Sequence, residues 1–398
     1  MKSKINALAK KYLSSVIEYR RHIHQNPELG FEEFQTTEFI KQKLAEEIDA
    51  DFKFALKRTK TGIYFDIDSK KPGKTLLFRA DIDALPIQEE NNFPYKSKVN
   101  GIGHMCGHDG HTASLIGVAK IINQLKDDFV GKVRFLFQPA EEGPDLGGAV
   151  EIVKENEVLA GVDCVIGMHI YGAGEFGKIY FKHEAMYSSF IDWDLTIKSA
   201  GGHCSEPHKV ADPVLIGSHA VVMFQSLITK MKAPLDSAII ATGVFNSGSN
   251  ANVIPSSAKL SGTIRTYDLE LGRLITKKMK SIMEGLKTVY GGDYQIDFLE
   301  GYPPLINDEE VTDSLIAISK EYFGSDNVKF IKNPSFGCED FSYFVNKVKG
   351  CYFKVGILKK NEKEPLHHSS TFNWDDSVLL TTMEASVNAI IGYLNKNS

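Results

Sequence analysis

Residue types that bind metals crowd into one short stretch of the chain. In "GHMCGHDGHTAS", residues 103–114, three histidines, a cysteine and an aspartate lie between His104 and His111, with glycines between them. Cys106 and His108 are two positions apart, a spacing that separates side chains on a helix but that a glycine-rich turn can bring to one point. A thiolate and an imidazole suit zinc and similar borderline metals. The plain alternative is a glycine turn with a buried cysteine and histidines in local hydrogen bonds.

Carboxylates and a histidine follow two apolar runs further along the chain. Glu141 and Glu142 come after "VRFLFQPA", and adjacent carboxylates repel each other unless a cation lies near them. His169 ends the run "VIGMHI", where a lone histidine is more often a core residue than a ligand. A solvated acidic loop and a core histidine are therefore the alternatives to a metal site here.

Two further segments complete the pattern. The segment "RADID" ends an apolar run with Asp81 and Asp83. These carboxylates could orient metal-bound imidazoles by hydrogen bonding to them without touching the metal. The segment "PLHHSSTFN" places His367 and His368 near the C-terminus. Each segment alone is a weak signal. Taken together, four strand or loop ends carry possible ligands. In chain order they carry aspartates, then Cys106 and His108, then the glutamate pair, then His169. One metal site explains all four better than a separate structural cause for each.

The elements that must position these residues alternate between strand and helix. The sequence predicts strands near 62–67, 74–82, 131–140 and 164–170, with helices near 110–126 and 147–158 between them. Alternating strands and helices predict an α/β fold with a largely parallel sheet. Ligands of such sheets bind beyond the carboxyl ends of the strands, where the candidate residues stand.

The pattern changes after about residue 187. A strand, a helix near 212–232, two strands, a helix near 269–290 and a final strand give a βαββαβ series, the order of a ferredoxin-like module. Chemistry-bearing residues resume after residue 330. We therefore expect a discontinuous catalytic domain, residues 1–187 and 298–398, interrupted by an inserted domain of residues 188–297.

Composition excludes several classes of function. The 398-residue chain has a net charge of −5 and no basic tract, so nucleic acid is not an expected partner. No apolar run approaches the roughly 20 residues of a membrane span, and the N-terminus lacks the apolar core of a secretory signal. The five cysteines are scattered and odd in number, which favours a reducing, cytoplasmic location over a disulfide framework.

The chain resembles the M20 metallopeptidases, and within them the amidohydrolase branch of aminoacylases, hippurate hydrolases and auxin-conjugate hydrolases. The resemblance runs from residue 20 to residue 372 and is strongest in "HMCGHDGH" and "PAEEG". The other matching segments are "RRHIHQNPELGFEE", "LFRADIDALP", "GMHI", "AGGHCSEPH", "ANVIP", "GTIRTYD", "GCEDFSYF" and "LHHSSTF".

This resemblance implies two divalent metal ions at the carboxyl edge of the sheet, of zinc, manganese, nickel or cobalt. By motif position, Cys106 is the implied bridging ligand, and the remaining implied ligands are His108, Glu142, His169 and His368. Glu141 is the implied general base, which takes a proton from a metal-activated water and gives it to the leaving amine. The implied reaction is hydrolysis of the amide bond of N-acyl amino acids, without a covalent intermediate.

The resemblance also gives the inserted domain a role as a lid and as the interface of a homodimer. His203, rather than His208, matches the family histidine that reaches the scissile carbonyl, and it could do so across the dimer. Asn252 and Arg265 match substrate contacts, and an arginine fork suits a substrate carboxylate. A salt bridge at a strand edge is the alternative for Arg265.

Three rival interpretations remain open. A dipeptidase or aminopeptidase of the same superfamily is the nearest, although those branches usually carry His-x-Asp where this chain has "ADID". A cysteine hydrolase would use Cys106 as nucleophile, and removing metal would not abolish its activity. A non-catalytic protein with a closed structural metal site is disfavoured by the doubled Glu141–Glu142.

Overall fold

The computed structural model describes residues 1–144 and 146–397 and divides into two compact units. Unit 1 comprises Met1–Met186, Ile306–Asn333 and Asp340–Ser398, and unit 2 comprises Tyr187–Leu305 and Pro334–Glu339. Unit 2 thus takes in Tyr187 and residues 298–305 and 334–339 in addition to the predicted 188–297. One reason is that the last long strand of unit 2 runs on to Glu300.

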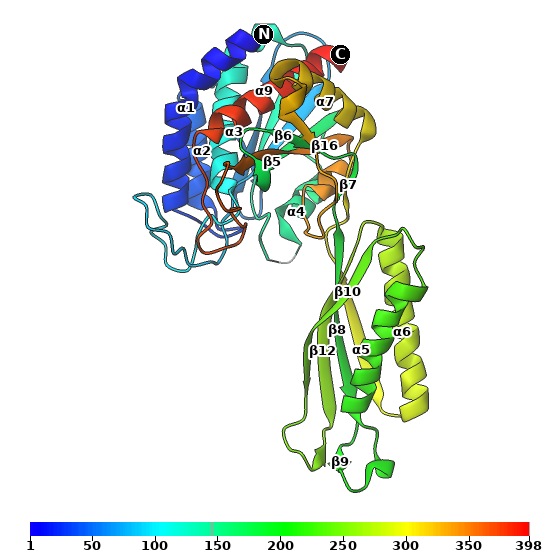
Figure 1. The fold of residues 1–398 in the computed structure, drawn as a ribbon. Helices are drawn as coiled ribbons and strands as arrows, with labels where there is room; N and C mark the ends of the chain where they lie inside the picture. Colours follow the sequence, from blue (N-terminus) through cyan, green and yellow to red (C-terminus); the bar gives the residue numbers. More distant parts are fainter. Residues whose placement is uncertain (145, 398) are drawn as a thin grey trace. The chain divides into compact units, whose positions relative to one another are not determined.

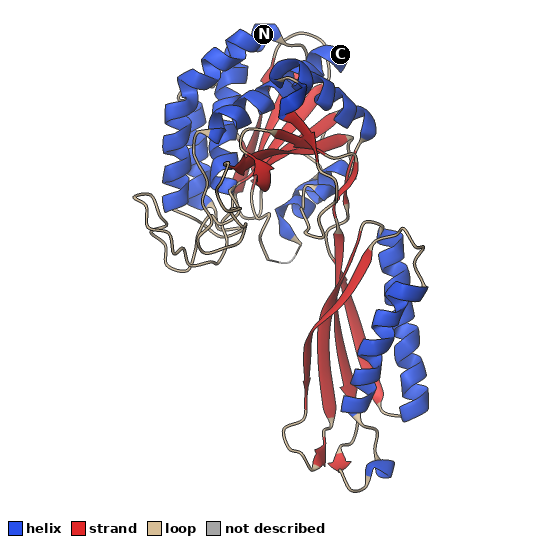
Figure 2. Ribbon diagram, in the orientation of Figure 1, coloured by secondary structure: helices blue, strands red, loops and turns tan. Residues whose placement is uncertain are grey.

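Unit 1 is built on an eight-stranded sheet (Figures 1 and 2). In spatial order its strands are β1 (Lys53–Leu56), β2 (Thr61–Asp68), β4 (Lys132–Gln138), β3 (Thr75–Asp81), β5 (Cys164–Glu175), β16 (Gly350–Leu358), β6 (Ile179–Phe181) and β15 (Val328–Phe330). The four central strands, β4 to β16, are mutually parallel, and antiparallel pairs lie toward the edges. The prediction of an α/β fold with a largely parallel sheet is confirmed.

The helices of unit 1 pack on this sheet and on one another. They are α1 (Lys2–Gln25), α2 (Phe34–Ala45), α3 (His108–Gln124), α4 (Gly147–Glu155), α7 (Glu309–Phe323), α8 (Ser342–Val345) and α9 (Val378–Asn397), with short 3-10 turns at Lys126–Asp128 and Ser325–Asn327. Helices α1, α3 and α9 contact one another (Figure 1). Helix α3 is buried on every face from residue 108 to residue 122, as expected of a helix inside a core, so its first turn is held rigidly.

Strand β5 extends further than the sequence predicts. It continues to Glu175, so His169 lies within the strand and the predicted strand end near residue 170 is wrong. The reason is β16, from a distant part of the chain, which pairs with β5 from Val165 to Glu175 and places Lys354 opposite His169. Since the hydrogen-bonding partner lies nearly 200 residues away in sequence, the local pattern could not reveal the extension.

Unit 2 contains a four-stranded antiparallel sheet in the order β10-β12-β8-β13. Its elements are β8 (Ser189–Lys198), β9 (Gly202–His203), α5 (Pro213–Lys230), β10 (Ala238–Ser247), β11 (Val253–Ile254), β12 (Ser257–Thr266), α6 (Leu269–Tyr290) and β13 (Asp293–Glu300), with a 3-10 turn at Pro207–Lys209. Both helices carry aspartate N-caps, Asp212 and Asp268, each accepting two backbone N–H bonds. Two short strands, β7 (Glu184–Tyr187) and β14 (Leu305–Asn307), pair where the chain passes between the units.

The βαββαβ order and the strand order of this sheet are those of a ferredoxin-like module. Its core consists of apolar side chains from the sheet and from α5 and α6, centred on Trp193 and Phe224. Among the residues that the structure describes, none of the helices combines the length and the apolar character needed to cross a bilayer.

Candidate metal centre

Five predicted site residues of unit 1 meet, four from turns and the start of α3 and His169 from within β5. They are Cys106, His108, Glu142, His169 and His368. The Sγ atom of Cys106 lies 3.4 Å from His169 Nε2, and His368 Nε2 lies 2.8 Å from Glu142 Oε1. Potential ligand atoms of Cys106, His108 and His169 fall within 4.8 Å of one another, and so do those of Cys106, Glu142 and His368. Cys106 therefore belongs to two adjacent groups of donors.

The turn before α3 presents two of these residues. Gly107 has a φ of 104°, and a Cβ there would come 2.3 Å from Ile170 Cδ1, so only glycine fits between Cys106 and His108. This turn reverses the chain just before the helix begins at His108. The predicted convergence of residues two apart is therefore achieved by the glycine and not by the helix.

The two buried histidines of the cluster are held in the same tautomer. His108 donates from Nδ1 to the carbonyl oxygen of Asp83 at 3.0 Å, and His169 donates from Nδ1 to that of Ile170 at 2.6 Å. A carbonyl oxygen can only accept, so in each neutral ring Nε2 keeps a lone pair. His108 Nε2 is buried and has no hydrogen-bond partner among residues 1–144 and 146–397. An unsatisfied buried nitrogen facing thiol and carboxylate groups is what a metal ligand requires.

Neighbouring histidines have different surroundings. His111 donates from Nδ1 to Asp81 at 2.6 Å and accepts from the backbone of Ile170 at Nε2, so both nitrogens are engaged. His367 is likewise engaged, with Cys106 O at 3.1 Å and Gly172 N at 3.3 Å. His104 is fully buried, and burial lowers its pKa to about 3. Of the histidine pair near the C-terminus, His368 is the one that reaches Glu142.

The two predicted supporting aspartates lie behind the cluster. Asp81 is fully buried, and its carboxylate contacts His111 and Arg79 Nη1, the latter at 2.6 Å. Arg79 also donates to Asp340 at 2.9 Å. Asp83 accepts from the backbone N–H of Glu142 at 2.8 Å, and its Oδ1 lies 3.4 Å from His108 Nδ1. Both aspartates therefore contact the cluster, and Asp81 Oδ1 also lies 3.8 Å from His108 Nε2.

Glu141 stands beside the cluster on the turn after β4. Its carboxyl Oε2 lies 3.8 Å from His108 Nε2, and the residue is 7% exposed. The neighbouring Ala140 has a φ of 56°, a left-handed conformation that is strained for any residue with a side chain. His368 has a φ of 63° as well, so two segments that carry the cluster store backbone strain, as functional sites often do.

Electrostatics match a cationic occupant. Burial raises the pKa of the Cys106 thiol, so the thiolate needs a cation beside it. Burial and the neighbouring rings of His111 and His367 hold the pKa of His169 well below its usual range, which keeps this imidazole neutral and able to ligate. Hydrogen bonds to Cys106 and Glu142 raise the pKa of His368 to about 10. A metal ion would compete with the proton on His368, so metal binding here releases protons.

The donor set fits divalent metal ions. One thiolate, three imidazoles and a carboxylate suit zinc and its borderline neighbours, while carboxylate and imidazole also admit manganese. The His368 side chain is 49% exposed, so the cluster is open on one side. Openness distinguishes catalytic metal sites from closed structural ones.

A buried ionic network lies behind the first turn of α3. Arg20, 1% exposed, donates to Asp109 at 3.0 Å and also contacts Asp376. Asp109 pairs with His24 Nδ1 at 2.9 Å, and His24 Nε2 lies 3.1 Å from Glu89. This network ties α1 to the residue that follows His108.

Unit 2 holds the remaining predicted residues at opposite ends of its sheet. His203 and Asn252 are both exposed. His203 ends β9, Asn252 directly precedes its partner strand β11, and Cys204 N donates to Asn252 O at 3.0 Å. Arg265 pairs with Phe190 at the other end, and its Nη1 donates to Cys338 Sγ at 2.6 Å. The structure brings His203 and Asn252 together and keeps both apart from Arg265.

Several contributing residues escaped sequence reasoning. Arg79 and Asp340 brace the cluster, and Glu33 contacts the turn that carries Glu141. Arg79 and Asp340 stand inside segments that matched the family, "LFRADIDALP" and "GCEDFSYF". A charged residue within an otherwise apolar strand was the available signal for Arg79, since such a residue must find a buried partner.

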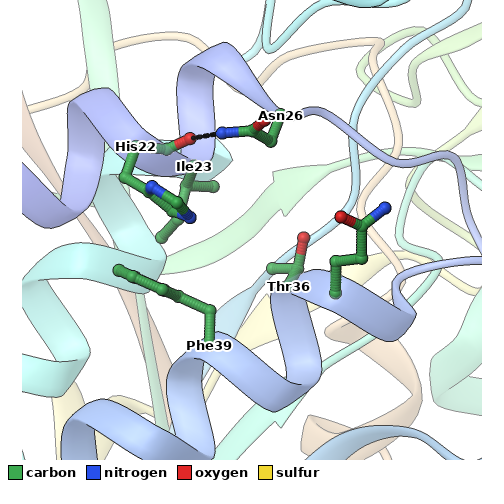
Figure 3. A pocket seen from close by; sticks show the side chains of 6 residues that line it. His22, Ile23, Asn26, Thr36 and Phe39 are labelled. Carbon is green, nitrogen blue, oxygen red and sulfur yellow. Dashed lines mark hydrogen bonds between the residues drawn. The ribbon is translucent and has the colours of Figure 1, made fainter.

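A small pocket between α1 and α2 is separate from the cluster (Figure 3). Its volume is about 80 Å³, and its lining residues are His22, Ile23, Asn26, Gln35, Thr36 and Phe39. The His22 ring stacks on Phe39 at 4.2 Å, and Asn26 donates to the His22 carbonyl at 2.7 Å. Pockets for small molecules usually exceed about 300 Å³, so this hollow does not qualify as a substrate site.

Comparisons with known proteins agree with this geometry. The sequence model of the peptidase family M20/M25/M40 matches residues 77–391 of this chain. An N-acyl-L-amino acid amidohydrolase of Geobacillus stearothermophilus is 39% identical over 309 residues, which cover 78% of this chain and 82% of that relative. A hippurate hydrolase of Campylobacter jejuni is 34% identical over 376 residues, which cover 94% of this chain and 95% of that relative.

A solved structure extends the likeness to the whole fold. A dinuclear metal-binding peptidase of the M20 family from Bacillus subtilis superimposes with a TM-score of 0.82 at 30% identity, covering 98% of this chain and 100% of its own. The resemblance noted from the sequence motifs is thereby confirmed. The chain belongs to the M20/M25/M40 peptidase family and is a hydrolytic enzyme that acts on amide bonds.

Proposed function

We propose that this enzyme hydrolyses the amide bond of N-acyl amino acids at a two-metal centre held by Cys106, His108, Glu142, His169 and His368. The observation that carries the proposal is the membership of Cys106 in two adjacent donor groups, beside a further carboxylate on Glu141. A thiolate that belongs to two groups of potential ligands would suit a pair of metal ions. When bound, the ions supply Lewis acidity that acidifies a water and polarises the acyl carbonyl.

Glu141 is the general base in this proposal. Its carboxylate is placed beside the ligands, 3.8 Å from His108 Nε2, and is close to fully buried. The Glu141 carboxylate accepts a proton from the attacking water and donates it to the amine nitrogen as the C–N bond breaks. The acyl carbon keeps the hydroxyl oxygen, so no bond forms between the substrate and the chain.

The amino-acid half of the substrate brings a carboxylate, for which Arg265 is the proposed partner. A guanidinium binds a carboxylate through two parallel hydrogen bonds. The relatives named as an N-acyl-L-amino acid amidohydrolase and a hippurate hydrolase support this substrate class. A 34% identical relative from Saccharolobus solfataricus named as a thermostable carboxypeptidase keeps peptides as the second candidate substrate class.

The positions of His203 and Arg265 support a homodimer. Eight residue steps along β8 separate the end near Arg265 from the end near His203, which is about 26 Å in an antiparallel strand. A small N-acyl amino acid cannot span that distance, so His203 and Arg265 of one chain do not contact the same substrate molecule. We propose that His203 and Asn252 serve the site of a second copy, where His203 meets the scissile carbonyl.

Unit 2 also offers a surface for the second copy. Strand β10 is an edge strand, and its exposed apolar side chains include Ile239, Val244 and Phe245. Helix α5 adds Val214, Leu215, Val222 and Met223. An open strand edge flanked by exposed apolar side chains favours pairing with an identical edge.

The test of the activity uses metal-stripped protein and a panel of acetyl and benzoyl amino acids, with dipeptides as the second arm. Added zinc, manganese, nickel or cobalt is expected to restore amine release from the acyl amino acids. Glu141→Gln should lower kcat by about 10²–10⁴-fold while the metal stays bound, as measured by elemental analysis. Full activity of Glu141→Gln would refute the assignment of the base, and cleavage of dipeptides alone would move the enzyme to the peptidases.

The test of the dimer mixes two inactive variants, Glu141→Gln and His203→Ala. If His203 acts on the partner's site, half of the re-equilibrated dimers are mixed and each has one intact site, so about one quarter of the wild-type activity returns. If His203 acts within its own chain, every mixed dimer lacks a complete site. No recovery would then be seen, and the proposal would fail.

A further inference from the structure

The turn that carries Glu141 and Glu142 is strained and needs external support. Ala140 adopts a φ of 56°, which costs about 1 kcal/mol or more for a residue with a Cβ. Its carbonyl accepts from Gly148 N at 2.7 Å, and its N–H donates to Glu33 Oε1 at 2.7 Å. Two residues on, the N–H of Glu142 donates to Asp83. Buried carboxylates therefore hold the backbone on both sides of Glu141.

Glu33 reaches this turn from a different element. It is 0% exposed and precedes α2, whose first turn is closed by the bond from Thr37 N to Glu33 O at 3.0 Å. The adjoining loop presses on the same turn, because a Cβ at Gly30 would lie 2.7 Å from Gly143 Cα and 3.0 Å from Ala140 Cβ. The Glu33 carboxyl is thus anchored in a helix while it binds a backbone N–H of the turn.

We propose that Glu33 is a positioning residue, which acts through the Ala140 N–H to hold Glu141 and Glu142 in their working places. The inference rests on the proposed function of those two carboxylates. Glu33 itself contacts neither substrate nor metal in this scheme. Removing its acceptor leaves the left-handed Ala140 without the bond that compensates its strain, so the turn relaxes and both carboxylates shift.

The decisive comparison is between Glu33→Met and Glu33→Gln. Methionine matches the length of glutamate but cannot accept the Ala140 N–H, whereas the glutamine amide oxygen can. Burial, followed by the Asp83 carboxylate, raises the pKa of Glu33 to about 8, so a neutral glutamine is a close substitute at pH 7. Glu33→Met is expected to lower kcat and to weaken metal affinity, each by about 10–100-fold, whereas Glu33→Gln stays within about threefold of wild type.

Two further readouts separate positioning from general damage. Hydrogen exchange of the peptide containing Ala140 should accelerate in Glu33→Met and not in Glu33→Gln. The matched control is Glu384→Met on α9, which removes another buried carboxylate, one that accepts from Asn6 and Tyr322. This control should lower the unfolding midpoint and leave metal affinity, measured by chelator competition, unchanged.

The inference would be overturned if Glu33→Met kept wild-type metal affinity and kcat, or if Glu384→Met caused the same losses. Should Glu33→Met not fold, Glu33→Asp keeps the carboxyl group but withdraws its oxygens by one methylene, and it is expected to show the same pattern to a smaller degree. Measuring metal affinity also distinguishes a failure of this inference from a failure of the proposed reaction. A wrong base assignment appears as full activity of Glu141→Gln and leaves the Glu33 effect on metal binding intact.

Discussion

His169 in unit 1 and His203 in unit 2 are held in opposite ways. His169 is 7% exposed, its ring is fixed by a backbone carbonyl, and its Nε2 faces Cys106 from an element 63 residues away in sequence. His203 is exposed, and its Nδ1 contacts Ser205, two residues along the chain. Distant partners fix the unit 1 residues before any substrate arrives. His203, by contrast, is held by a contact two residues along the chain, and its side chain stays open to solvent.

The cysteines give the largest expected contrast. Cys106→Ala removes the donor shared by both groups of the cluster, so kcat/KM with added metal should fall by more than about 100-fold, beyond the usual loss from a mutated supporting residue. Cys204→Ala removes an exposed thiol next to His203 and should change kcat/KM by less than about twofold. Equal losses in both variants would erase the contrast between the units.

A buried arginine and an exposed one provide the next comparison. Arg20→Met leaves Asp109 buried with its main ion-pair partner gone, which should cost about 3–5 kcal/mol of unfolding free energy. Arg273→Met in unit 2 breaks exposed pairs with Glu270 and Glu300 and should leave the unfolding midpoint nearly unchanged.

Two tryptophans allow the units to be followed separately in urea. The chain has two, Trp193 in unit 2 and Trp374 in unit 1, both buried. In a Trp193→Phe background, fluorescence reports on unit 1, where Arg20→Met is measured. In a Trp374→Phe background it reports on unit 2, where Arg273→Met is measured. A large shift from Arg273→Met would contradict the prediction.

The same network makes unit 1 sensitive to alkali. Burial opposes the charged form of His24, but hydrogen bonds to Asp109 and Glu89 outweigh it and raise the pKa of His24 to about 9. The unfolded pKa is near 6.5, so the stabilisation of about 3 kcal/mol is fully present below pH 6.5 and is lost as the pH rises through 9. Urea unfolding from pH 6 to 10 should show this decline in the parent chain and a flatter profile in His24→Gln. If the stability of the parent chain and of His24→Gln fell in parallel with pH, this prediction would be wrong.

Helix caps give the smallest expected effects, and these fall in unit 2. Asp212→Ala and Asp268→Ala each remove two hydrogen bonds to helix N–H groups and should cost about 1 kcal/mol. Asp212→Asn keeps an accepting oxygen and should cost little. If the alanine and asparagine variants unfold alike, the cap bonds do not contribute to stability.

The contrast between the units also explains what the sequence could predict. Cys106 and His108 are marked by a local glycine turn, and the Glu141–Glu142 pair and the aspartates by the apolar strands that precede them. Short-range patterns of this kind survive folding, so the gathering of these side chains and the α/β fold were predictable. The support behind them was not, because Arg20 meets Asp109 across 89 residues and Arg79 meets Asp340 across 261.

Long-range partners account for the other differences as well. The extension of β5 past His169 depends on β16, and the position of Arg265 depends on Cys338, 73 residues further along the chain. No periodicity or turn signal links such pairs, since each member looks ordinary in its own segment. Only packing decides which distant residues become partners.

The insertion of unit 2 into unit 1 also sets an order of events during synthesis. All four long strands of unit 2 have been synthesised once Glu300 has been translated. At that moment β5 and β6 still lack β16, which lies between them, and His368 does not yet exist in the nascent chain. The centre of the sheet therefore keeps open edges, a state prone to aggregation, until β16 has been synthesised. Catalytic competence is the last property this polypeptide acquires.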